Sequence, residues 1–223
     1  MAKEDARIPA EIGCLDTENL RVTLISTQGA HCDVWQTAGY HFEREKNRTF
    51  DMVIKRHTLT CHSLEVMIYR RDYGMLKKKL HDIIPEAIFV RTRIDGEENM
   101  LVLAQAFTPW FNLANPAIAD DAIPLMAKLH KARLQLGLFI QTAKEIRREQ
   151  QKVIDLYGLD NLVLDKNKEV RYLDSFEVFF HEDLLYIIDD PGEDLRDKID
   201  VSVKRLAYLE FVLASANELA ATL

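Results

Sequence analysis

The chain changes character at Phe107, and this change constrains its fold more than any other feature. Before Phe107, short segments with the composition of strands alternate with polar turns, whereas after it apolar residues recur every three to four positions. Strands followed by helices are typical of α+β proteins. A chain of 223 residues can bury a core without disulfides or structural metals. We therefore predict an α+β fold with an N-terminal extension at 1–19, a sheet-containing lobe at 20–107 and a mostly helical lobe at 108–223.

Five segments of the first lobe are expected to form strands, at 21–26, 32–38, 49–56, 87–94 and 100–107. A turn at Gln28-Gly29 would join the first two strands, and one at Asp95-Gly96 would join the last two. Apolar residues at helical spacing from Ser63 to Leu80 predict one helix between the third and fourth strands. The result is a five-stranded, mostly antiparallel sheet with a single helix packed on it.

The second lobe is expected to begin with an irregular connector at 110–116. Asp120 and Asp121, just before Pro124, indicate the start of a helix, because aspartate caps free N–H groups and proline fits the first turn. Apolar spacing extends this helix to about Val153. The remaining elements are two hairpin strands beneath that helix, a chain break and a last helix, at 162–164, 170–173, 190–192 and about 195–220.

Composition limits the partners that this chain can have. Lys and Arg number 29 against 36 Asp and Glu, a net charge of -7, so the overall field repels nucleic acid, and we expect no nucleic-acid partner. The sequence has no apolar run of about 18 residues, so no membrane span is expected. Cys14, Cys32 and Cys61 form no C-x-x-C pair, which disfavours a disulfide framework and a thiolate zinc site. The charged N-terminus does not resemble a signal peptide, and we expect a cytoplasmic protein.

Lys55 is the first candidate functional residue. It closes the apolar run 52–54 of the predicted third strand. A half-buried ammonium group on a strand needs an anionic partner or ligand, since burying it alone is unfavourable. Glu65, in the first turn of the following helix, could be that partner. The alternative is an outward-facing lysine on an edge strand.

Asn161 and Asp174 flank the predicted small hairpin. Asn161 lies just before its first strand and Asp174 just after its second, so their side chains should converge at one end of the hairpin. Amide and carboxylate oxygens suit Mg²⁺, which takes few protein ligands and shares the rest with phosphates and water. The alternative is that both residues only form turns, where Asn and Asp are common.

These residues resemble the protein-kinase-like superfamily in an atypical, shortened form, over a span from about Leu20 to Phe176. Met52-Val-Ile-Lys55 resembles the V-A-I-K of the third kinase strand. Asp160-Asn161-Leu-Val-Leu resembles the end of the catalytic loop, and Leu173-Asp174-Ser175-Phe176 resembles the D-F-G segment. The 13-residue separation of Asn161 and Asp174 is close to that of kinase-like enzymes. Small bacterial kinase-like proteins of the YrbL kind are the nearest relatives that the resemblance indicates.

The resemblance implies a kinase-like bilobal fold that binds ATP and Mg²⁺. Lys55 would hold the nucleotide phosphates with Glu65 as its partner, and Asn161 and Asp174 would hold the metal. The other implied contacts to the nucleotide come from the phosphate loop and from the strand that ends the first lobe, at Gly29, Val34, Gln105, Ala106 and Phe107.

The sequence departs from the family in its catalytic residues. The family places its base five residues before the metal-binding asparagine, and here that residue is Leu156. Asp155, six residues before Asn161, becomes the candidate base if the chain bulges by one residue, for example at Gly158. The phosphate loop has one glycine, and no A-P-E segment follows Phe176. With only 47 residues remaining, we expect a reduced second lobe and no protein substrate docked on an activation segment.

Three functional hypotheses follow from these residues. The first is a phosphotransferase that acts on a hydroxyl of a small molecule or of an unidentified protein. The second is a pseudokinase that serves as a nucleotide-sensing or protein-interaction module, which Leu156 and the sparse glycines favour. The third is an unrelated α+β protein in which Asn161 and Asp174 are turn residues.

Overall fold

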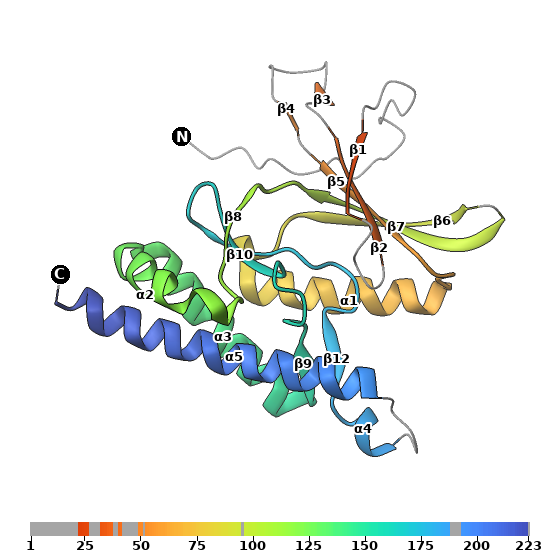
Figure 1. Cartoon of the computed structure of the whole chain (residues 1–223). Helices are drawn as coiled ribbons and strands as arrows, with labels where there is room; N and C mark the ends of the chain where they lie inside the picture. Colours follow the sequence, from red (N-terminus) through yellow and green to blue (C-terminus); the bar gives the residue numbers. More distant parts are fainter. Residues whose placement is uncertain are drawn as a thin grey trace. The chain divides into compact units, whose positions relative to one another are not determined.

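The computed structural model has an α+β fold (Figure 1). It describes residues 22–26, 32–37, 40–41, 49–50, 52–94, 96–187 and 193–222, and within these it contains a five-stranded antiparallel sheet and five α-helices. Four sequence predictions lie outside the described residues: the extension at 1–19, Gly29, Asp95 and the break at 190–192. In the part of the chain that the structure describes, no helix is both long and apolar enough to cross a membrane.

Internal packing divides the chain into two units. The first unit contains the described residues up to Arg71 together with Pro85–Phe107, and the second contains Asp72–Ile84 and the described residues of Thr108–Leu223. The division after Phe107 falls where the sequence changes character. Residues 72–84, however, pack with the second unit, although they lie within the predicted first lobe.

The first unit is built on the five-stranded sheet. Its antiparallel strands lie in the order β1 (Val22–Ser26), β2 (Cys32–Thr37), β5 (Met52–His57), β7 (Glu97–Gln105) and β6 (Ala87–Ile94). The predicted third strand is observed as β4 (Thr49–Phe50), which pairs with β3 (Tyr40–His41), and β5. Gly96, between β6 and β7, has a φ of 87°, a conformation that glycine adopts without strain.

Helix α1 (Ser63–Leu80) has the predicted bounds and is followed by a 3₁₀ turn, η2 (His81–Ile83). Its first turn is capped, because a Glu65 carboxylate oxygen accepts the His62 backbone N–H at 2.7 Å, as in one half of a capping box. The first half of α1 contacts the sheet of its own unit, where the Tyr69 ring stacks on His57 with centroids 5.9 Å apart.

The second unit contains helices α2 (Ala119–Lys128), α3 (His130–Gln150), the short α4 (Leu184–Ile187) and α5 (Glu193–Ala220). Figure 1 shows α5 running beside α2 and α3, and all three contact one another. The predicted single helix up to Val153 is wrong. It breaks at Leu129, whose φ of -110° and ψ of 78° are not helical, and Arg133 donates to the Met126 and Ala127 carbonyls near the break. Pro124 lies inside α2 rather than in its first turn.

Short strands complete the second unit. The predicted hairpin is confirmed as β10 (Leu162–Asp165) and β11 (Val170–Tyr172). The predicted connector at 110–116 instead contributes β8 (Pro109–Asn112), which pairs with β10, and a 3₁₀ turn, η3 (Pro116–Ile118). Strand β9 (Lys152–Ile154) follows α3 and pairs with β12 (Phe179–His181). Buried Val153, Phe180 and Ile199 join β9, β12 and α5 in one hydrophobic cluster.

Candidate functional site

The β10–β11 hairpin brings Asn161 and Asp174 together, as the sequence predicts. Leu162 lies opposite Tyr172 in the hairpin, and the Leu173 N–H donates to the Asn161 carbonyl at 2.8 Å. This extends the pairing beyond the strands, so the two side chains meet at the open end. The Asn161 Nδ2 atom lies 3.5 Å from Asp174 Oδ2.

The Asp174 carboxylate is oriented by its own backbone. Its Oδ1 atom accepts the N–H groups of Ser175 at 2.6 Å and Phe176 at 3.3 Å. These contacts leave the Oδ2 atom directed at Asn161.

Gly158 provides the space for the Asn161 side chain. A Cβ atom at position 158 would overlap Asn161 Oδ1 and would lie 2.9 Å from its Cγ atom, closer than real Cβ contacts. The Asn161 N–H also donates to the Gly158 carbonyl at 3.3 Å. Glycine is therefore the residue that allows the loop from Asp155 to close against Asn161.

Asp155 is the third member of the site. Its carbonyl accepts the Asn161 Nδ2 group at 3.3 Å, and its carboxyl group interacts with both Asp174 and Asn161. Leu156, the residue at the family's base position, is fully buried. The chain therefore turns Leu156 into the core and Asp155 towards the other two side chains, which is the geometry that the one-residue bulge predicts.

The electrostatics of the site are dominated by its two carboxyl groups. Burial, and then the charge of Asp174, raise the pKa of Asp155 to about 8, while hydrogen bonds from the Tyr157 backbone and Asn161 oppose the rise. The Tyr157 N–H donates to Asp155 Oδ1 at 2.6 Å. When both groups are ionised their charges repel each other, and a cation beside them would relieve that repulsion.

Tyr172 lies beneath the site and was not found from the sequence. It is fully buried, and its hydroxyl donates to the Asp155 carbonyl at 3.0 Å. Burial raises its pKa well above 10, and the charges of Asp174 and Asp155 add to the rise, so the phenol remains a neutral donor. The one signal in the sequence is a tyrosine in a short buried strand, where the hydroxyl needs a partner.

Two residues of α5 also reach the loop, and sequence reasoning missed both. The Ser202 hydroxyl accepts the Leu156 N–H at 3.1 Å. The Arg205 guanidinium donates to the Leu156 carbonyl at 2.6 Å and to the Tyr157 carbonyl. Because Ser202 and Arg205 lie more than 40 residues further along the chain than Leu156, no local pattern predicts these contacts.

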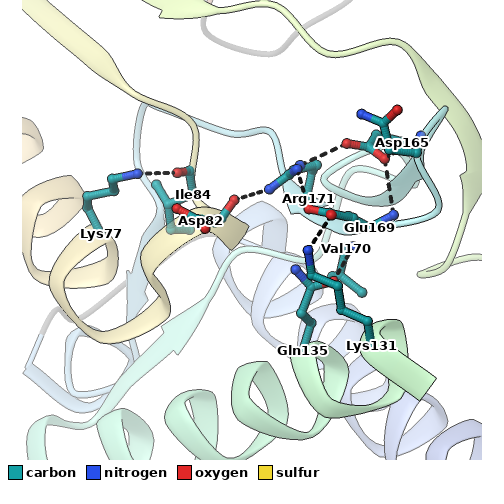
Figure 2. Close-up of polar contacts among 10 residues, drawn as sticks. Lys77, Asp82, Ile84, Lys131, Gln135, Asp165, Glu169, Val170 and Arg171 are labelled. Carbon is teal, nitrogen blue, oxygen red and sulfur yellow. Dashed lines mark hydrogen bonds and ion pairs between the residues drawn. The ribbon is translucent and has the colours of Figure 1, made fainter. Parts of the chain in front are cut away.

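The opposite end of the hairpin is held by a polar network (Figure 2). Asp165 is fully buried and pairs with the Arg171 guanidinium at 2.9 Å. Arg171 also pairs with Glu169 at 2.7 Å and donates to the Asp82 carbonyl in η2, which ties the hairpin to the segment after α1. Asp165 additionally accepts the N–H groups of Asn167 and Glu169, which closes the hairpin turn. The hairpin that positions Asn161 and Asp174 is thus fixed at both ends.

Asp155, Asn161 and Asp174 are the residues that could hold a hard cation such as Mg²⁺. Among the described residues, no group of three or more His, Cys, Asp or Glu side chains is arranged to hold a metal. Magnesium in nucleotide sites needs only one or two carboxylates with phosphates and water. Asp174, the neighbouring Asp155 and the Asn161 amide meet that requirement. A cation would bind the amide oxygen of Asn161, so the amide would have to turn over from its present orientation.

Lys55 lies on the middle strand of the sheet, so the edge-strand alternative is wrong. It is half-buried and lies directly opposite Val34 of β2 and Val102 of β7. Directly opposite residues of an antiparallel pair share a face, so Lys55 and Val34 project on the side where Val102 is fully buried. Glu65, its predicted partner, contacts the His62 backbone at the start of α1.

The predicted adenine-binding segment lies at the end of β7. The Gln105 N–H donates to the Glu86 carbonyl at 2.9 Å, so this N–H is not available to a base. Ala106 and Phe107 follow the strand and are half-buried. Gly29, the predicted phosphate-loop glycine, lies outside the described residues.

The candidate residues are divided between the two units. Val34, Lys55, Glu65 and the segment 105–107 belong to the first, and Asp155, Asn161 and Asp174 belong to the second, where they form one cluster. No model of a known protein family matches the chain, and no curated protein matches it.

Proposed function

We propose that this protein is an ATP- and Mg²⁺-dependent phosphotransferase with a kinase-like bilobal fold, which transfers the γ-phosphoryl group to a hydroxyl of a small molecule or of a protein. The observation that supports this most is the cluster of Asp155, Asn161 and Asp174 at the open end of one hairpin. Two carboxyl groups and an amide in contact are more than turn formation requires.

Each residue of the cluster has a role in this proposal. Asn161 and Asp174 hold Mg²⁺, which neutralises phosphate charge when bound. Asp155 orients the acceptor hydroxyl and takes its proton, which requires the carboxylate form. Positive charge beside Asp174 favours that form, because it offsets the repulsion that raises the pKa of Asp155. Phosphoryl transfer depends mainly on positioning and electrostatic stabilisation, which a fixed cluster can supply.

The first unit supports the same proposal. Lys55 projects from the middle strand on the same face as Val34, as a phosphate-binding lysine should. The chain leaves the first unit after Phe107, and the residues of a hinge, which would contact the base, lie in the segment that ends there. Ala106 and Phe107 follow β7 in that segment and are half-buried.

One observation favours the second candidate, a pseudokinase that binds nucleotide without turnover. Leu156 at the family's base position is buried in the core, so catalysis depends on Asp155 acting from the neighbouring position. A base displaced by one residue would weaken turnover more than nucleotide binding.

Thermal unfolding with and without ATP and Mg²⁺ tests the nucleotide binding that both candidate functions require. A ligand at about ten times its Kd stabilises the native state by about 1.4 kcal/mol, which for a chain of this size raises Tm by about 3–6 °C. We expect this shift with ATP and Mg²⁺ together, and its loss in Asp174→Ala and Lys55→Ala. Asp160→Asn, an exposed charge change on the same loop, is the matched control and should keep the shift. No shift at millimolar nucleotide in the wild type would rule out both kinase-like functions and leave the unrelated α+β protein.

ATP turnover then separates the two candidates. We expect Asp155→Asn to bind nucleotide as the wild type does but to lose turnover, because the amide keeps the loop contact and cannot accept a proton. Wild-type binding without turnover above that of Asp155→Asn would instead establish the pseudokinase. Equal rates in wild type, Asp155→Asn and Asp174→Ala would show that the measured activity belongs to a contaminant.

A further inference from the structure

Helix α5 bonds the backbone of the loop that bears Asp155. Ser202 is almost fully buried, and its hydroxyl accepts the N–H of Leu156 at 3.1 Å. Arg205, one turn further along α5, donates through one nitrogen to the Leu156 carbonyl at 2.6 Å and to the Tyr157 carbonyl. The backbone N–H and the backbone carbonyl of Leu156 are therefore both bonded by the same helix.

The Arg205 contact involves the peptide unit that also holds Asp155. The carbonyl of Leu156 and the N–H of Tyr157 belong to one planar peptide group. Arg205 donates to the Leu156 carbonyl of that group, and the Tyr157 N–H of the same group donates to Asp155 Oδ1 at 2.6 Å. Fixing the carbonyl end of a planar group also fixes the direction of its N–H. Arg205 therefore acts on the Asp155 carboxyl group through one rigid peptide plane.

The guanidinium is also close enough to the site to be influenced by its charge. Burial lowers the pKa of Arg205, and the negative charge of Asp155 opposes this decrease. Both bonds leave the same terminal nitrogen, whose two N–H groups are held in the plane of the guanidinium, so this one nitrogen bonds two successive carbonyls.

We propose that Arg205 is a positioning residue that locks the Leu156–Tyr157 peptide plane and thereby holds the Asp155 carboxyl group towards Asn161 and Asp174. Its consequence for catalysis rests on the proposed function, whereas its effect on the loop does not. The two effects are therefore measured separately, by amide exchange and by turnover.

Native-state hydrogen exchange of the full chain tests the effect on the loop. Arg205→Met removes the donors but keeps the aliphatic stem, and we expect about a tenfold faster exchange in residues 155–161 with little change in the β10–β11 hairpin. Arg205→Lys keeps a charged donor without the rigid guanidinium plane and should give a smaller increase. Lys204→Met, which removes an exposed charge one residue away, should match the wild type.

Two exchange results would overturn the proposal: unchanged exchange at 155–161 in Arg205→Met, or an increase spread equally over the second unit. If Arg205→Met does not fold, Arg205→Gln replaces it. This variant retains a single amide donor and should show the same local increase.

Turnover tests the catalytic consequence. We expect Arg205→Met to lower kcat about tenfold or more with the KM for ATP within about twofold, and Arg205→Lys to restore part of kcat. A rise in KM at unchanged kcat would overturn the positioning role. If the wild type has no turnover, the phosphotransferase proposal fails, while the exchange experiment still decides whether Arg205 locks the loop.

Discussion

At the scale of single residues, the candidate site depends on residues that position its side chains but have no proposed role in catalysis. Gly158 gives Asn161 its space, Leu156 anchors the loop in the core, and the buried Tyr172 hydroxyl holds the Asp155 carbonyl. Asn161 and Asp174 could be predicted from the sequence because they flank a local hairpin. Tyr172 and Arg205 could not, since a contact partner distant in sequence leaves no mark on local periodicity.

Substituting Gly158 tests whether the Asn161 side chain needs the space that a Cβ atom at position 158 would occupy. In Gly158→Ala the new Cβ atom would overlap the Asn161 amide, so that side chain must leave Asp174. We expect a stability loss of about 1 kcal/mol and loss of the Mg²⁺-dependent part of the thermal shift. Gly74→Ala is the control: Gly74 lies exposed within α1 with open space around it, so alanine there should stabilise by about 0.5–1 kcal/mol. A retained Mg²⁺ response in Gly158→Ala would contradict this role.

Cys61 should be inert in the native state. It is fully buried, and burial followed by the charge of Glu65 raises its pKa to about 11. The reactive thiolate therefore forms only as the pH approaches 11, and at pH 8 it is about a thousandth of the population. We expect iodoacetamide at pH 8 to leave Cys61 unmodified until the protein unfolds, as peptide mass mapping would show. Half-buried Cys32 provides the internal comparison. Rapid native labelling of Cys61 would mean that its segment opens readily.

At the scale of elements, alternation and turn residues predicted all five strands of the main sheet, and helical spacing predicted α1 within its observed bounds. Strands β8, β9 and β12 were missed because they have only three or four residues and no alternation to detect. The break at Leu129 was missed because the apolar spacing continues across it. Of the short strands, only β10 and β11 were predicted, because a polar turn joins them into a local hairpin.

The hairpin that presents Asn161 and Asp174 contains a buried charge pair between Arg171 and Asp165. Arg171→Met would leave the Asp165 carboxylate buried without its partner. We expect a loss of about 3–5 kcal/mol in the free energy of unfolding, measured by urea denaturation. Lys131→Met is the control, because Lys131 is largely exposed and its pair with Glu169 should contribute about 0–1 kcal/mol. Equal losses in the two variants would show that burial of the pair is unimportant.

At the scale of the whole molecule, the chain passes between the two units more than once. It leaves the first unit within α1, contributes residues 72–84 to the second unit, returns to form β6 and β7, and leaves again after Phe107. This connectivity was not predicted, because helix periodicity does not show which unit each half of a helix packs with. A boundary drawn at residue 107 alone therefore does not separate two self-sufficient domains.

A fragment containing only residues 108–223 should not fold, because it lacks a buried part of its own core. The missing segment supplies five buried apolar side chains, Tyr73, Leu76, Leu80, Ile83 and Ile84. At about 1.5–3 kcal/mol each, they contribute on the order of 10 kcal/mol, comparable to the whole stability of a typical domain. The segment also supplies Asp72, whose largely buried ion pair with Lys152 would be lost.

Circular dichroism and dye binding would show the outcome. We expect the 108–223 fragment to lose cooperative thermal unfolding and to bind a hydrophobic dye, whereas residues 72–84 joined to it by a flexible linker should restore a cooperative transition. The matched control is the same fusion with Leu76 and Leu80 of the joined segment changed to serine. It supplies the helix without these buried side chains and should not restore the cooperative transition. Cooperative unfolding of the bare fragment would mean that residues 72–84 contribute little to the stability of the second unit. The boundary between two independently folding domains could then be placed at Phe107.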